Sequence, residues 1–242
     1  MKVLVLAGTA EARALSHALE QLPGITVVVS LAGATARPAD YAGVVRSGGF
    51  GGVDGLVRFV RTEHVDAVVD ATHPFAAQMS AGVTEAAGRC GVPLLRLSRA
   101  AWTATEGDRW VEVDDLPAAA DALQRLRPGC ALLALGRRHL VPFGRVTGVR
   151  LVVRSVEPAD LSSLSDAVME VGRGPFSVGD ERALLRRHGV GAVVARNSGG
   201  DDAKLVAARE LGVPVIMVSR PPATGPAVTS IDDALAWLRR VR

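Results

Sequence analysis

The alternation of short apolar runs with helix-like segments is the feature of this sequence that most constrains its fold. Residues 2–7 (KVLVLA) form a continuous apolar run suited to a buried parallel strand, and residues 11–21 place apolar side chains at helical spacing. Gly8 separates the two segments as a turn. Because this order of strand, turn and helix recurs along the chain, the sequence predicts an α/β protein with open, mainly parallel sheets.

The repeats fall into two groups, separated by residues 98–115, where the pattern is lost. The first group has apolar runs at 2–7, 25–31, 44–46, 66–70 and 92–97, with helical segments at 11–21, 53–64 and 75–89. The second has apolar runs at 130–136, 149–153, 167–171, 192–195 and 213–218, with helical segments at 116–126, 179–187, 202–211 and 231–241. We therefore expect two Rossmann-like domains, residues 1–98 and 99–242, with a ligand in the cleft between them.

Composition narrows the range of functions. The 242 residues are 48% hydrophobic, yet no apolar run approaches the roughly 20 residues that span a bilayer, so we expect a cytoplasmic protein without a membrane partner. The net charge is only +3, and the arginines lack interleaved aromatic residues, which favours a small anionic ligand over nucleic acid. Cys90 and Cys130 match no metal-ligand spacing, so no metal site is expected.

The first turn, Gly8 to Arg13 (GTAEAR), keeps one glycine of the dinucleotide-binding pattern G-x-G-x-x-G. A tight turn at Gly8 would present backbone N–H groups at a helix start, and Thr9 would add a hydroxyl to hold a phosphate. Arg13, the last residue of the motif, is a further candidate contact for the cofactor. A plain strand-to-helix turn explains the same residues without a ligand.

The end of the second apolar run favours NADP over NAD. An NAD-preferring fold usually carries an acidic residue there for the ribose hydroxyl, but no acid occurs before Asp40. Ser30, Thr35 and Arg37 instead suit a 2′-phosphate. A solvated loop arginine is the alternative for Arg37.

Residues 46–52 (RSGGFGG) follow the third apolar run. The glycines, of which we select Gly48, Gly49 and Gly51, would let the backbone approach a nucleotide, and Phe50 would lie against an adenine or nicotinamide ring. The alternative is a flexible loop in which Phe50 anchors in the core.

Residues 70–76 (DATHPFA) follow the fourth apolar run. Thr72 is expected to cap the next helix and to lie near the cofactor, with Pro74 near the first helical turn. Asp70 and His73 would then face the ligand together. A capped helix with a satisfied histidine is the structural alternative.

The sequence resembles the precorrin-6A reductases of cobalamin biosynthesis over nearly the whole chain. The resemblance rests on the motifs GTAEAR, RSGGFGG and DATHPFA in that order, followed by GRGPFS at 172–177 and NSGGDDAKLVAARELGVPVIMVSRPP at 197–222. The resemblance implies that NADPH reduces one carbon-carbon double bond of a ring-contracted tetrapyrrole. It implies hydride delivery to carbon 19 and protonation of carbon 18, giving precorrin-6B without a metal. It also implies a nucleotide on the first domain and the macrocycle between the two.

Two positions depart from the family pattern. Ala100 stands where the family commonly has proline, and Arg196 stands where lysine is more usual. Arg196 keeps the positive charge, but a guanidinium stays protonated in proteins, so we do not expect it to donate a proton.

A substrate with many carboxylates needs scattered cations, and planar guanidinium groups suit carboxylates well. The candidate contacts lie in or before loops and are Arg99, Arg137, Arg138, Arg154, Arg173 and Arg196. Ser198, Gly199 and Gly200 would offer N–H groups to a further carboxylate at the start of the helix that carries Lys204. Lys204 is then a carboxylate contact or a proton source, with an exposed helix lysine as the alternative.

The catalytic candidates are thus Asp70, His73 and Lys204, in no order that the sequence decides. A short-chain dehydrogenase is excluded, because the only tyrosine, Tyr41, has Val45 rather than lysine four residues later. Two alternatives stay open: reduction of the cobalt-containing substrate, and a non-enzymatic NADP(H)-binding sensor.

Overall fold

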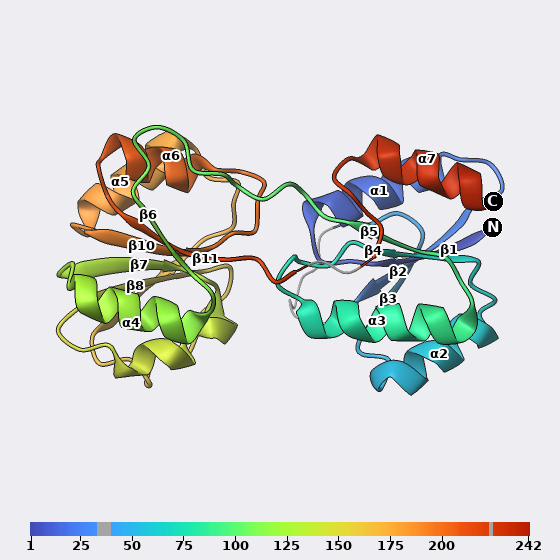
Figure 1. The fold of residues 1–242 in the computed structure, drawn as a ribbon, viewed down its shortest axis with the longest axis horizontal. Coiled ribbons are helices and arrows are strands. Elements are labelled where there is room, and N and C mark those ends of the chain that lie inside the picture. Colours follow the sequence, from blue (N-terminus) through green and yellow to red (C-terminus); the bar gives the residue numbers. More distant parts are fainter. Residues whose placement is uncertain (33–39, 223–224) are drawn as a thin grey trace. The chain divides into compact units, whose positions relative to one another are not determined.

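The computed structural model describes residues 1–32, 40–222 and 225–242. The chain forms two compact units, one made of residues 1–100 with 221–242 and the other of residues 101–220. Each unit contains a six-stranded sheet whose neighbouring strands all run parallel, covered by helices (Figure 1). The predicted fold class is confirmed, while the cleft expected between the domains stays a prediction.

The first unit has strand order β12-β5-β4-β1-β2-β3. Its strands are β1 (Lys2–Leu6), β2 (Thr26–Leu31), β3 (Val44–Ser47), β4 (Ala67–Asp70), β5 (Leu94–Leu97) and β12 (Ala227–Val228). Its helices are α1 (Ala10–Glu20), α2 (Gly52–Thr62), α3 (Ala77–Cys90) and α7 (Ile231–Val241).

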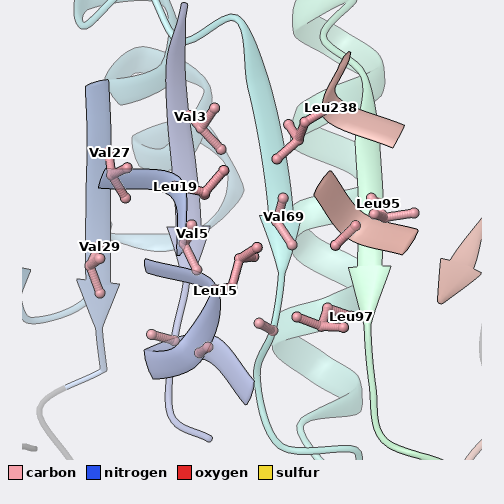
Figure 2. Close-up of a cluster of buried hydrophobic side chains, with 14 of the residues drawn as sticks. Val3, Val5, Leu15, Leu19, Val27, Val29, Val69, Leu95, Leu97 and Leu238 are labelled. Atoms are coloured by element: carbon pink, nitrogen blue, oxygen red, sulfur yellow. The ribbon is translucent and has the colours of Figure 1, made fainter. Parts of the chain in front are cut away.

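Burial of both sheet faces explains why these strands are continuous apolar runs. Successive side chains of a strand point to opposite faces, so Val3 and Val5 join the cluster beneath α1 and α7, whereas Leu4 joins the cluster beneath α2 and α3. Figure 2 shows Leu15 of α1 and Leu238 of α7 over the first of these faces. The sheet is therefore the middle layer of three (Figure 1).

The C-terminal segment corrects the expected domain boundary. We expected residues 99–242 to form the second domain, but residues 221–242 belong to the first unit. Strand β12 pairs with β5, and α7 buries Ala234 and Leu238 in the core shared with α1. The helix itself was predicted correctly at 231–241, but its local sequence does not say which sheet its apolar face covers.

The second unit has strand order β6-β11-β10-β7-β8-β9. Its strands are β6 (Trp110–Val113), β7 (Cys130–Ala134), β8 (Arg150–Ser155), β9 (Ala167–Val171), β10 (Ala192–Arg196) and β11 (Val215–Val218). Its helices are α4 (Leu116–Leu126), α5 (Val178–Arg187) and α6 (Ala203–Glu210), with short 3-10 segments η1 (Arg137–His139) and η2 (Val141–Arg145). Helices α5 and α6 share one face of the sheet, and α4 lies on the other (Figure 1).

No helix within the described ranges is long and apolar enough to cross a membrane.

Candidate active site

The loops after β1 and β4 meet at the carboxyl edge of the first sheet. The two strands are neighbours, but the chain leaves β1 toward β2 on one side and reaches β5 beyond β4 on the other. Ligands of open α/β sheets bind at such a switch point. The hydroxyl of Thr9 joins the two loops by donating a hydrogen bond to the carbonyl oxygen of Ala71 over 2.9 Å.

The turn after β1 uses its polar groups partly for structure. Gly8 has a φ of 150°, in the region that favours glycine, and Thr9 caps α1 by accepting a 3.1 Å hydrogen bond from the amide of Ala12. Because the Thr9 hydroxyl donates its own proton to Ala71, it has none left for a phosphate. The backbone N–H groups at the start of α1 are the better anion donors. Arg13 is exposed on α1.

Sequence reasoning missed Arg46, which organises the glycine-rich stretch after β3. Its Nη1 donates to the Ser30 hydroxyl over 2.7 Å and to the Gly48 carbonyl over 3.1 Å, and its Nη2 donates to the Gly49 carbonyl over 3.1 Å. Its position as the first residue of RSGGFGG was the available signal. Thr35 and Arg37, the other predicted phosphate contacts, lie outside the described residues.

Phe50 is half-buried, as the core-anchor alternative predicts. Its ring packs edge-on against Phe59, with ring centres 5.2 Å apart, in the cluster beneath α2 and α3. The Arg46 guanidinium lies 3.9 Å from the centre of the Phe50 ring. Arg46 therefore covers one face of the Phe50 ring, and stacking of this ring on a nucleotide base stays a prediction. Gly48 and Gly51 have φ values of 106° and 80°, which restricts these positions to glycine without strain.

Asp70 is 3% exposed, and its carboxylate is occupied by protein groups. Its Oδ1 accepts hydrogen bonds from the amide and hydroxyl of Thr72, at 3.1 and 2.6 Å, and its Oδ2 accepts one from the Ser80 hydroxyl at 2.6 Å. Arg96 approaches Oδ2 to 4.0 Å. This geometry fits a residue that positions the loop better than one that exchanges protons with a substrate.

Thr72 does not cap α3, contrary to the prediction. The helix begins at Ala77, with Ala76 at the cap position and no side-chain cap hydrogen bond. The physical reason is sequence distance: a capping side chain accepts from an amide two or three residues ahead of it, but the cap position of α3 is Ala76. The Thr72 hydroxyl instead donates to Asp70. Residues 72–76 therefore form a turn before the helix.

His73 lies in this turn and is partly exposed. Its Nδ1 accepts a 3.2 Å hydrogen bond from the amide of Phe75, so the neutral ring carries its proton on Nε2. Of the two candidates after β4, His73 is the more exposed, since Asp70 is 3% exposed.

In the second unit, Arg196 and His139 lie together at the equivalent switch point between β10 and β7. Nη1 of Arg196 donates to Nε2 of His139 over 2.9 Å, and its Nη2 donates to the Leu135 carbonyl over 3.3 Å. Burial lowers the pKa of Arg196 to about 10. Burial also lowers the pKa of His139, with further contributions from the charges of Arg196 and Arg138.

The other predicted substrate arginines differ in how closely they pair with acidic residues and in how exposed they are. Arg154 forms a 2.6 Å ion pair with Glu181, with side chains only 10% and 3% exposed, so its charge is already matched inside the protein. Arg137 pairs with the half-buried Glu157 at 2.9 Å. Arg138 and Arg173 are exposed at the loops after β7 and β9, and Arg99, which belongs to the first unit, lies 3.7 Å from Glu11.

The loop before α6 does not leave a vacant helix start. The amide of Ala203, the first residue of α6, donates to the carboxylate of Asp201 over 2.9 Å. The amide of Ser198, one of the predicted anion donors, donates to the carbonyl oxygen of Arg196 over 2.6 Å. Lys204 places Nζ 4.4 Å from the centre of the Trp102 ring, a cation–π contact.

Two parallel sheets, each with polar loops gathered at its switch point, define a protein of the Rossmann-like α/β class. The family model described as "Precorrin-6x reductase CbiJ/CobK" matches residues 2–239, and the chain belongs to this family of oxidoreductases.

Relatives and a solved structure agree with this assignment. A precorrin-6A reductase of Rhodococcus erythropolis is 44% identical, over 98% of this chain and 97% of its own. A cobalt-precorrin-6A reductase of Priestia megaterium is 31% identical over 90% of both chains. The solved structure of "CobK precorrin-6A reductase" covers 100% of this chain and 97% of its own, with a TM-score of 0.93 at 42% identity.

Proposed function

We propose that the protein reduces precorrin-6A with NADPH, delivering hydride to carbon 19 and a proton to carbon 18 to give precorrin-6B. The observation that carries this proposal is the near-complete match to precorrin-6A reductases, 44% identical over 98% of the chain. The metal-containing substrate is less well supported, because the cobalt-precorrin relative is 31% identical.

The donors at the edge of the first sheet fit a nicotinamide dinucleotide. The N–H groups at the start of α1 suit a diphosphate. Gly8 leaves room for the diphosphate to approach the backbone, since even a Cβ added at this glycine would meet no atom within 4 Å. Ser30 and Arg46, which are hydrogen-bonded to each other, supply a hydroxyl and a cation at the same sheet. When bound, NADPH supplies the hydride.

The residues of the chain then bind the substrate, orient it and supply the proton. We assign Asp70 to positioning, because its carboxylate holds Thr72 and Ser80. His73 is the preferred proton donor on the nucleotide-binding unit, and Lys204 is the second candidate. A well-placed acid typically contributes about 10²–10⁴-fold in rate, so loss of the true donor would be conspicuous.

Carboxylates of the macrocycle would bind the arginines of the second unit. Arg138 and Arg173 are exposed, and Arg196 lies at the switch point of the sheet. Arg137 and Arg154 are less suitable, since each already pairs with a glutamate. The predicted cytoplasmic location stays a prediction.

The test follows NADPH absorbance after mixing purified protein with precorrin-6A, beside parallel reactions with NADH and with the cobalt-containing macrocycle. Oxidation of NADPH by the metal-free substrate, with one equivalent of reduced product, is the expected result. Binding of NADPH without turnover of either macrocycle would sink the proposal and favour a sensor. His73→Gln and Lys204→Met, assayed for turnover and for NADP⁺ affinity, then separate the two proton-donor candidates.

A further inference from the structure

We propose that Arg46 is the residue that selects NADPH over NADH, by binding the 2′-phosphate of the adenosine ribose. This inference rests on the proposed function, since it assigns a role within that cofactor site. It differs from the sequence-based expectation, which gave the role to Ser30, Thr35 and Arg37.

The position of Arg46 in the sheet is the first argument. In parallel register, Arg46 of β3 lies directly beside Ser30 of β2. In Rossmann-type sheets, the group that reads the ribose 2′ position lies about 20 residues past the glycine turn, at the end of the second strand. An acid there would bind the two ribose hydroxyls, whereas this site offers a hydroxyl and a guanidinium.

The second argument is the unbalanced charge of Arg46. Its three hydrogen bonds to described residues all go to neutral oxygens, those of Ser30, Gly48 and Gly49. No carboxylate of the described residues forms an ion pair with it, and residues 33–39 and 223–224 contain no Asp or Glu. By contrast, the partly buried Arg154 and Arg209 pair with Glu181 and Asp108. A cation held without a matching acid attracts an anionic ligand.

The third argument is the fixed orientation of the guanidinium. Contact with the Phe50 ring at 3.9 Å and the hydrogen bonds to the glycine carbonyls hold its plane before any ligand arrives. The N–H groups that these bonds leave over, together with the Ser30 hydroxyl proton, are donors for phosphate oxygens. Because the side chain is already ordered, little conformational entropy is lost on binding.

A purely structural role is the competing explanation, because Arg46 also holds the glycine-rich stretch in place. The two roles differ in which nucleotide they affect. A structural arginine supports NADP⁺ and NAD⁺ alike, whereas a 2′-phosphate contact affects only NADP⁺.

The experiment measures dissociation constants for NADP⁺ and NAD⁺ by isothermal titration calorimetry. It compares the wild type with Arg46→Met, Arg46→Lys and, as a matched control, Arg58→Met. Arg58 is exposed on α2 and carries the same charge. We expect Arg46→Met to weaken NADP⁺ binding by about 10–100-fold, the loss of a charge-assisted phosphate contact, while NAD⁺ binding changes less than about 2-fold. The NADP⁺ dissociation constant of Arg46→Lys should lie between those of the wild type and Arg46→Met. Arg58→Met should bind both nucleotides as the wild type does.

Three outcomes would overturn the inference: equal losses for both nucleotides, no loss for NADP⁺, or a selective loss in Arg37→Met but not in Arg46→Met. If Arg46→Met fails to fold, Arg46→Lys and Ser30→Ala carry the same comparison between the nucleotides. Failure of the proposed function looks different, because the wild type itself would then bind neither nucleotide or would not turn over the macrocycle.

Discussion

The guanidinium of Arg196 donates a hydrogen bond to Nε2 of His139 over 2.9 Å. Arginine has no acceptor, so Nε2 must be unprotonated and the neutral imidazole must carry its proton on Nδ1. A protonated His139 would lose this hydrogen bond and place two cations side by side. The pair therefore makes the second unit sensitive to pH at the carboxyl edge of its sheet.

His139 predicts a loss of stability on acidification. Its pKa in the folded protein lies below the ordinary value of 6.5, so the unfolded chain takes up the proton first as the pH falls. The stabilisation is complete above about pH 6.5 and disappears as the pH falls through the lower, folded pKa. His139→Gln keeps an acceptor for Arg196 and should lose less stability in thermal unfolding between about pH 7.5 and 5.5. An identical pH dependence in wild type and variant would contradict this, and the exposed His17→Gln is the control.

Removal of one partner from the buried pair of Arg154 and Glu181 should be strongly destabilising. Glu181→Gln leaves the guanidinium without a countercharge, where the two side chains are 10% and 3% exposed, and should cost about 3–5 kcal/mol in urea unfolding. Glu210→Gln is a matched control, because its 2.8 Å pair with Arg182 is about 40% exposed on both sides and should cost less than about 1 kcal/mol. Equal costs would mean that burial of the pair does not matter.

Gly55 should not tolerate alanine, although it lies inside helix α2. A Cβ at this position would overlap the carbonyl oxygen of Phe50, so the glycine-rich stretch must shift. We expect Gly55→Ala to lower the free energy of unfolding by at least about 1–3 kcal/mol. Gly88→Ala in α3 meets no atom within 4 Å and should instead stabilise by about 0.5–1 kcal/mol, the helix-propensity gain. A neutral Gly55→Ala would show that the stretch yields easily.

Gly49→Val tests whether the glycine-rich stretch approaches the cofactor. Gly49 is exposed, its φ is not positive, and the nearest atom to an added Cβ is 4.0 Å away, so the fold should accept valine. If the backbone contacts the nucleotide here, the bulk of valine should raise the dissociation constants for NADP⁺ and NAD⁺ together, by about 10-fold, 1.4 kcal/mol. Fluorescence titration measures this. An unchanged affinity with an unchanged melting temperature would leave the stretch a purely structural loop.

The regular elements with buried faces were readable from the sequence. Helices at 116–126 and 231–241 and the strand at 167–171 were predicted with the bounds that the structure gives. Strands β6 and β12 were missed, although β3 and β9, the strands at the opposite edges of the two sheets, were predicted. β6 is partly exposed along its length and β12 has only two residues, so neither forms a continuous apolar run.

The loops of the candidate site were also readable, but the partners of their side chains were not. Glycine turns at strand ends indicated the correct edge of the sheet. The carboxylate of Asp70 contacts Ser80 of helix α3 and Arg96 of the neighbouring strand β5, which no local pattern in the sequence brings together. Arg46 was passed over as a strand residue, because only the register between β2 and β3 brings it to Ser30. Contacts set by packing leave no local pattern.

The position of α7 also fixes an order of events during synthesis. Residues 101–220, the whole second unit, are synthesised before residues 221–242. When the last residue of the second unit is added, the first unit still lacks strand β12 and the side chains of Ala234 and Leu238, which cover the apolar face shared with α1. The unit whose synthesis begins first is therefore the last to receive all of its residues.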